Sequence, residues 1–185
     1  GCPKMICNIL ITYQDGTTEN IVSDESWKAS AGPVTFSSSY GGEDYNATLE
    51  QVGWNKPGFN DGKWRKGITM DGPQNLQAQS AYPLKILDSF TIKKITQPKP
   101  GIWVYDMGQN ASAIPELTVE GKRGDEVTIR PAELLDDSGL VMQAPVGTPV
   151  YFNYTLKGSG AETWHPQFMY YGFRYIQVEG ASPAN

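Results

Sequence analysis

Two carboxylates and an amide lie close together at a bend introduced by two glycines, in residues 41–46 (GGEDYN). Neighbouring oxygen ligands on a bend suit Ca²⁺, which takes about six to eight oxygens. Glu43, Asp44 and Asn46 are therefore candidates for binding sugar hydroxyls, and Glu43 and Asp44 are candidate calcium ligands. The alternative is an edge turn, in which the two carboxylates accept hydrogen bonds from backbone amides.

An aromatic loop follows at residues 53–64, with Trp54 and Asn55 near its start and Trp64 at its end. Aromatic rings stack on the apolar face of a pyranose ring, so an exposed tryptophan beside amides is typical of a sugar platform. We predict carbohydrate binding at Trp54 and Asn55. Burial is the alternative for both tryptophans, because this residue is highly buried on average, and Trp64 is the better candidate for a core anchor.

Catalysis would require further pairs of polar groups. Inverting glycosidases hold two carboxyl groups about 6.5–9.5 Å apart, and Glu133 with Asp106 or Glu43 would be the candidate pair. His165 is the single histidine, and no serine or cysteine motif accompanies it. A lone histidine is weak evidence of catalysis, so the carboxylate pair is the remaining candidate, and its separation does not follow from the sequence.

Composition and charge exclude several other classes of function. The net charge is −5 and the charges are interspersed, which argues against a nucleic-acid interface with a clustered basic face. No apolar run is long enough to span a bilayer. Cys2 and Cys7 are interpreted as thiols, with a bridge between them as the alternative. A single histidine argues against a transition-metal site, so any metal would be oxygen-bound like calcium.

Short β-branched and aromatic runs must position these residues. Asp15-Gly16 between two such runs predicts a hairpin, and 20 glycines with 13 prolines favour turns over long helices. Residues 97–101 (QPKPG) indicate a domain boundary. We therefore predict an all-β fold with little helix, as two consecutive β-sandwich modules of jelly-roll or lectin-like type, residues 1–97 and 98–185.

Three segments carry a family resemblance: residues 104–110 (VYDMGQN), 130–135 (RPAELL) and 171–180 (YGFRYIQVEG). Together they closely resemble the bacterial α-L-rhamnosidases of glycoside hydrolase family 78. In that family such segments belong to β-sandwich modules that precede a catalytic helical barrel, and the barrel supplies the acid and base. The resemblance implies that this chain is not itself an enzyme, and that its parent is an inverting α-L-rhamnosidase.

The resemblance further implies an accessory role, in which the chain supports the catalytic helical domain and binds L-rhamnose-containing glycans on its first module. Some family members bind rhamnose there with calcium, and no other cofactor is implied. Two alternatives are an independent calcium-assisted carbohydrate-binding module and a scaffold that binds no sugar.

Family members carry further strands before the segment that resembles residues 5–13, so we expect the first module to be incomplete at its N-terminus. Unpaired edge strands would then favour association between copies. The resemblance also implies an extracytoplasmic location in a bacterium, whether secreted, periplasmic or at the cell surface.

Overall fold

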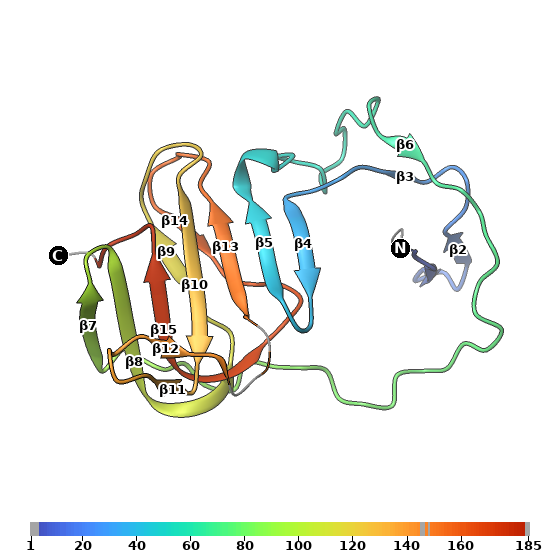
Figure 1. Ribbon diagram of the computed structural model, residues 1–185. Helices are drawn as coiled ribbons and strands as arrows, with labels where there is room; N and C mark the ends of the chain where they lie inside the picture. The colour runs from blue at the N-terminus through green and yellow to red at the C-terminus, as the bar shows by residue number, and fades with distance from the viewer. Residues whose placement is uncertain (1–3, 145–146, 148, 184–185) are drawn as a thin grey trace. The chain divides into compact units, whose positions relative to one another are not determined.

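The computed structural model describes residues 4–144, 147 and 149–183, and strands are almost its only regular elements (Figure 1). The predicted all-β fold with little helix is confirmed, since the described residues contain no α-helix and only short 3-10 segments such as η1 (Ala47–Leu49). Consequently no described helix has the length and apolar composition needed to cross a membrane.

The chain folds into two compact units, and each unit combines two separate stretches of sequence. The first unit comprises Gly1–Ala31 with Val52–Lys85, and the second comprises Gly32–Gln51 with Ile86–Asn185. Residues 32–51 thus pack with the C-terminal half of the chain. The module boundaries at 1–97 and 98–185 stay a prediction.

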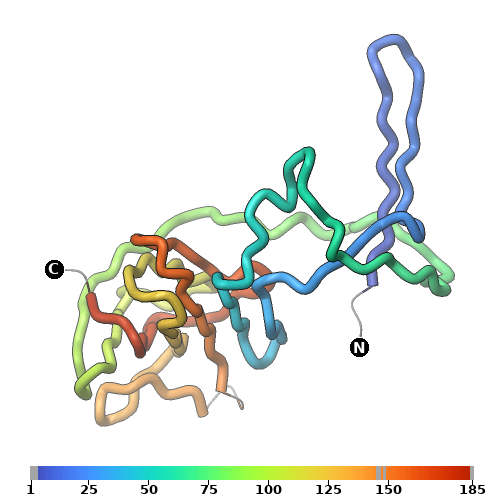
Figure 2. Tube along the Cα trace, turned by 90° about the horizontal axis from the view of Figure 1, so that it is seen from above, coloured from blue at the N-terminus to red at the C-terminus, as the bar shows by residue number. Residues whose placement is uncertain are grey.

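The first unit is built from two-stranded pairs. Strand β1 (Asn8–Thr12) pairs with β2 (Thr18–Val22), and β3 (Lys28–Ala29) pairs with β6 (Arg65–Lys66), both antiparallel. The β1–β2 hairpin predicted from Asp15-Gly16 is confirmed, and its two arms run side by side in blue in Figure 2. Gly16 has φ +85° at the turn, a conformation that glycine adopts without steric cost. Cys7 carries a free thiol, and Cys2 lies outside the described residues.

The second unit contains a seven-stranded sheet in the order β4-β5-β13-β10-β15-β8-β7. The β5–β13 pair is parallel and the other pairs are antiparallel. Four short strands complete the unit, as the pairs β9–β14 and β11–β12. The strand bounds are β4 (Val34–Ser38), β5 (Gly42–Asn46), β7 (Lys94–Lys99), β8 (Ile102–Ala113), β9 (Leu117–Val119), β10 (Glu126–Ala132), β11 (Leu134–Leu135), β12 (Val141–Met142), β13 (Tyr151–Thr155), β14 (Glu162–Trp164) and β15 (Tyr171–Glu179).

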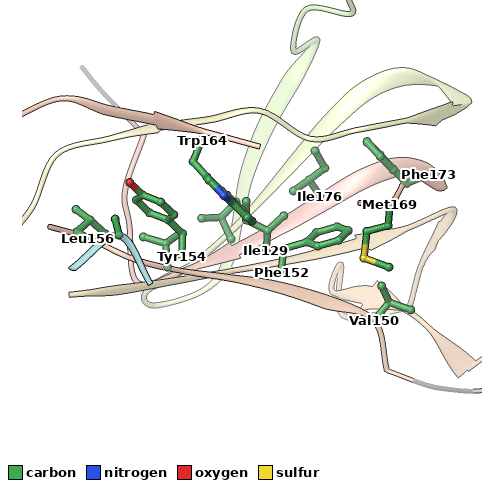
Figure 3. Packing of buried hydrophobic residues seen from close by; sticks show 12 residues of the cluster. Ile129, Val150, Phe152, Tyr154, Leu156, Trp164, Met169, Phe173 and Ile176 are labelled. Atoms are coloured by element: carbon green, nitrogen blue, oxygen red, sulfur yellow. The ribbon is translucent and has the colours of Figure 1, made fainter. Parts of the chain in front are cut away.

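The core of the second unit lies on one face of this sheet (Figure 3). Side chains alternate along a strand, and β13 accordingly buries Phe152 and Tyr154 while the residues between them face the other side. Trp164 of β14 packs against this layer, with its ring centroid 5.3 Å from that of Tyr154. The β9–β14 pair therefore supplies the second layer of a β-sandwich.

Candidate functional site

Glu43 and Asp44 are adjacent in β5, so their side chains point to opposite faces of the sheet. Glu43 is fully buried, and its carboxylate accepts hydrogen bonds from the backbone N–H of Gln167 (3.1 Å) and of Phe168 (3.2 Å). Asp44 Oδ1 accepts a bond from the Asn153 amide at 3.0 Å. The contacts of Glu43 are those of the alternative interpretation, a carboxylate that satisfies backbone amides.

The geometry of β5 does not form the convergent set of oxygens that Ca²⁺ takes. The carboxylates of Glu43 and Asp44 face apart, and Asn46 Oδ1 caps the 3-10 turn by accepting the Thr48 N–H at 3.0 Å. Among the residues that the structure describes, no group of three or more His, Cys, Asp and Glu could hold a metal ion. Calcium and sugar binding by these residues stay predictions.

The remaining two candidates, Trp54 and Asn55, belong to the first unit, whereas Glu43, Asp44 and Asn46 belong to the second. Neither unit brings all five residues together. Trp54 is 62% exposed and Asn55 is also exposed. Trp64 is half-buried and meets Phe59 edge-on, with centroids 5.6 Å apart, and its role as a core anchor stays a prediction.

The carboxylates considered as a catalytic pair are each engaged in a structural contact. Asp106 of β8 accepts two hydrogen bonds from Arg174 of β15, at 2.8 and 2.9 Å. This guanidinium holds the pKa of the Asp106 carboxyl below its ordinary value, the opposite of what a general acid needs. Glu133 Oε1 accepts a bond from the Asn110 amide at 2.8 Å. These contacts pin turns and strands together.

Sequence reasoning missed a cavity of about 270 Å³ in the second unit. It opens where η1 and the end of β5 meet the segment from β13 to β14, so its walls come from residues far apart in the chain. Its lining includes Tyr45, Glu50, Lys157, Glu162, Trp164 and His165. The only sequence signal was the Trp-His pair at 164–165, and nothing in it indicated the partner segment.

Glu162 fixes the loop that forms one wall of this cavity. The buried carboxylate accepts the Tyr154 hydroxyl at 2.8 Å and three backbone N–H groups, from Lys157 (3.1 Å), Gly158 (2.8 Å) and Ser159 (3.1 Å). Burial raises the pKa of the Glu162 carboxyl, but these donors outweigh burial and hold the pKa below its ordinary value. Glu162 is therefore ionised at neutral pH, and its negative charge is stabilised by these four hydrogen bonds.

A second set of contacts joins the end of η1 to the same loop. Glu50 forms an ion pair with Lys157 at 2.7 Å and accepts the Tyr45 hydroxyl at 3.0 Å. Burial, followed by the charge of Glu50, raises the pKa of Tyr45 to about 12, so this hydroxyl remains a donor. By contrast, Trp164 Nε1 is a buried donor with no acceptor among the described residues.

Comparison with known proteins decides the family. The protein family described as "Alpha-L-rhamnosidase N-terminal domain" matches residues 1–88 of the chain. A second family, described as "Bacterial alpha-L-rhamnosidase concanavalin-like domain", matches residues 96–185. The chain belongs to the bacterial α-L-rhamnosidase family. The predicted resemblance is thus confirmed, and the matched region is the N-terminal, non-catalytic part of such proteins.

Curated relatives and solved structures agree with this assignment. The α-L-rhamnosidase of Streptomyces avermitilis is 38% identical over 181 residues, which are 96% of this chain and 18% of that protein. An α-L-rhamnosidase from Formosa agariphila is 31% identical over 189 residues, which are 98% of this chain and 20% of that protein. The S. avermitilis crystal structure, complexed with L-rhamnose, superposes with a TM-score of 0.91 at 37% identity over 97% of this chain and 18% of its own. The chain therefore spans about a fifth of the length of its curated relatives.

Proposed function

We propose that this chain is the accessory β-sandwich region of an inverting α-L-rhamnosidase that acts on rhamnose-containing glycans outside the bacterial cytoplasm. Its role is to support the catalytic helical domain of that enzyme. The observation that carries the proposal is the order of the two family matches along one chain, together with a fold shared with an α-L-rhamnosidase structure.

The second face of the large sheet suits contact with a further domain. Ile129 and Val178 enter the core, so Arg130 and Glu179 point to the opposite face, where they form an ion pair at 3.1 Å. The Arg130 guanidinium also lies 5.6 Å from the centre of the Tyr151 ring. These half-buried charged and aromatic groups are held in place, and interfaces between domains are more polar than a core.

A chimera tests this role. The segment of the S. avermitilis enzyme that aligns with this chain is replaced by this chain, and a second protein lacks the segment altogether. We expect the chimera to hydrolyse a chromogenic α-L-rhamnoside and the deleted protein to lose activity, while the chain alone gives no turnover. A well-folded chimera that is as inactive as the deletion would contradict the proposal.

Carbohydrate binding is a second candidate, favoured by the exposed ring of Trp54 beside Asn55. Calorimetric titration with L-rhamnose, with calcium and again after chelation, separates the alternatives. Saturable heat that disappears on chelation would support a calcium-assisted module with Glu43 and Asp44 as ligands, and heat that survives would support sugar binding without metal. Absence of heat for both the chain and its Trp54→Ala variant would leave the scaffold role.

We also propose that copies of this chain associate with one another through an exposed edge strand. Strand β4 forms one edge of the seven-stranded sheet, and Phe36 on it is exposed. An edge strand offers unpaired N–H and C=O groups to a second chain. We expect the molar mass from light scattering to rise with concentration and Phe36→Lys to suppress this rise. A strictly monomeric protein across a wide concentration range would exclude it.

A further inference from the structure

We infer that three exposed rings of the second unit, those of Tyr40, Phe168 and Tyr170, dock against an apolar, uncharged surface of the catalytic helical domain of the same enzyme. These three residues form the aromatic patch. The inference rests on the accessory role proposed above and adds a contact surface to it. Unlike Arg130 and Glu179, the residues of the aromatic patch lie outside the strands of the large sheet.

Hydrogen bonding brings the two segments of the aromatic patch together. Tyr40 lies in the turn between β4 and β5, whereas Phe168 and Tyr170 lie in the segment that leads into β15 (Figure 1). The hydroxyl of the next residue, Tyr171, donates to the Ser39 carbonyl at 2.8 Å, so the turn and this segment are in contact. Burial, followed by the charge of an ionised Tyr40, raises the pKa of Tyr171, in agreement with neighbouring side chains.

The buried carboxylate of Glu43 fixes the backbone that carries two of these rings. It accepts the backbone N–H of Gln167 at 3.1 Å and that of Phe168 at 3.2 Å. Met169, between Phe168 and Tyr170, is buried in the core, whereas both rings beside it are exposed. A surface that is already held in place loses little conformational entropy when a partner binds, which favours docking.

The sequence around the aromatic patch contains no charged side chain. Residues 34–42 (VTFSSSYGG) and 166–173 (PQFMYYGF) include no Asp, Glu, Lys or Arg, although these types make up 19% of the chain. Depletion of charge with enrichment of aromatic residues is typical of the centre of a protein–protein interface. A sugar site also needs placed amide or charged groups, and these segments offer Gln167 alone. The composition therefore favours a protein partner.

The area of the aromatic patch selects a partner within the same polypeptide. Its side chains are between 51% and 79% exposed, and from the ~150–250 Å² that one aromatic side chain can bury they present roughly 300–500 Å². A separate partner needs about 800 Å² on each side of a stable interface. Domains of one chain bury only about 600–1,500 Å² in total, because the tether keeps their effective concentration high. The region matched by this chain makes up 18% and 20% of two curated relatives, so most of each protein lies outside it.

Hydroxyl-radical footprinting with mass spectrometry tests the inference, because oxidation rates report the solvent accessibility of each side chain. The chain alone, at a dilution at which it is monomeric, is compared with the chimera that carries it in the S. avermitilis enzyme. We expect the oxidation rates of Tyr40, Phe168 and Tyr170 to fall several-fold in the chimera. Ile95 is 41% exposed on β7, at the opposite edge of the sheet from β4, and its rate should not change.

Substitution tests the same surface through stability. Tyr40→Ser, Phe168→Ser and Tyr170→Ser together should shorten the half-life of the rhamnosidase activity of the chimera on heating by at least about tenfold, because aromatic anchors carry much of the energy of an interface. The same substitutions should leave the thermal midpoint of the chain alone nearly unchanged, since the rings are exposed there. Ile95→Thr is the control and should leave the half-life of the chimera nearly unchanged.

The outcomes separate this inference from the accessory role. A folded but inactive chimera would overturn both. An active chimera whose three rings oxidise as fast as in the chain alone, or whose half-life does not respond to the triple substitution, would overturn the docking surface and leave the accessory role standing. Protection of the rings in the chain alone by added L-rhamnose would assign the aromatic patch to a glycan and would also overturn the inference.

Discussion

The two compact units contain similar kinds of residues but bury them very differently. In the second unit, Phe152, Ile129 and Leu156 are each less than 2% exposed. In the first unit, Ile68 and Tyr82 are 91% and 97% exposed, and none of its described residues is buried. Apolar composition alone therefore does not explain which unit has a core.

The difference follows from the number of strands and layers. The first unit has only two-stranded pairs, and an isolated pair is marginally stable in water at best. The second unit combines seven strands with a second layer that closes over one face. We conclude that the second unit is stable by itself, whereas the exposed apolar side chains of the first require burial against another surface.

The largest expected effect comes from removing a core ring. Phe152→Ala should destabilise the second unit by about 3–5 kcal/mol, because the cavity adds to the lost transfer free energy. The matched change in the first unit, Ile68→Ala, should alter the free energy of unfolding by less than about 0.5 kcal/mol. Urea titration measures both. Similar costs for the two variants would contradict the contrast between the units.

Two glycines with positive φ provide the next test. Gly42 has φ +113°, and a Cβ there would lie 1.7 Å from the Tyr151 carbonyl oxygen, at the start of the parallel β5–β13 pair. Gly53 in the first unit has φ +82° and open space around it. Gly53→Ala should cost about 1–2 kcal/mol, the penalty of a left-handed residue alone.

Gly42→Ala carries the same backbone penalty and must also displace β13, so its midpoint in urea should fall clearly further than that of Gly53→Ala. Equal midpoints would mean that β5 is not held against β13.

A smaller effect is expected at Glu162. Glu162→Gln removes the charge from four hydrogen bonds and should cost about 1–3 kcal/mol at neutral pH. The folded pKa of Glu162 lies below the ordinary value of 4.5, so its contribution is present above pH 4.5 and is lost as the pH falls through the folded pKa.

The free energy of unfolding of wild type and Glu162→Gln should therefore converge in acid. Glu25→Gln, which alters an exposed carboxylate bonded to Thr69 in the first unit, is the control and should be nearly silent at every pH. A constant gap between wild type and Glu162→Gln down to the acid transition would argue against the role of this carboxylate.

Local patterns in the sequence predicted what depends on neighbouring residues. Asp15-Gly16 indicated its hairpin, and the many glycines and prolines indicated short strands. The segments at 104–110, 130–135 and 171–180 identified the family.

The pairing of strands that lie far apart in the chain could not be predicted from the sequence. Residues 42–46 lie beside residues 151–155 in parallel, and this pairing buries Glu43 and forms the cavity at Trp164. Adjacency in sequence suggested that Glu43 and Asp44 act together, but the alternation of a strand separates their side chains.

Hydrogen exchange tests the central claim most directly, because it reports the stability of each strand in the intact chain. Amides of β10, β13 and β15 should exchange slowly, at rates set by unfolding of the whole second unit, whereas those of β1 and β2 should exchange within the dead time or shortly after it. Equal protection of the two groups would show that the first unit has a core of its own and would contradict the account.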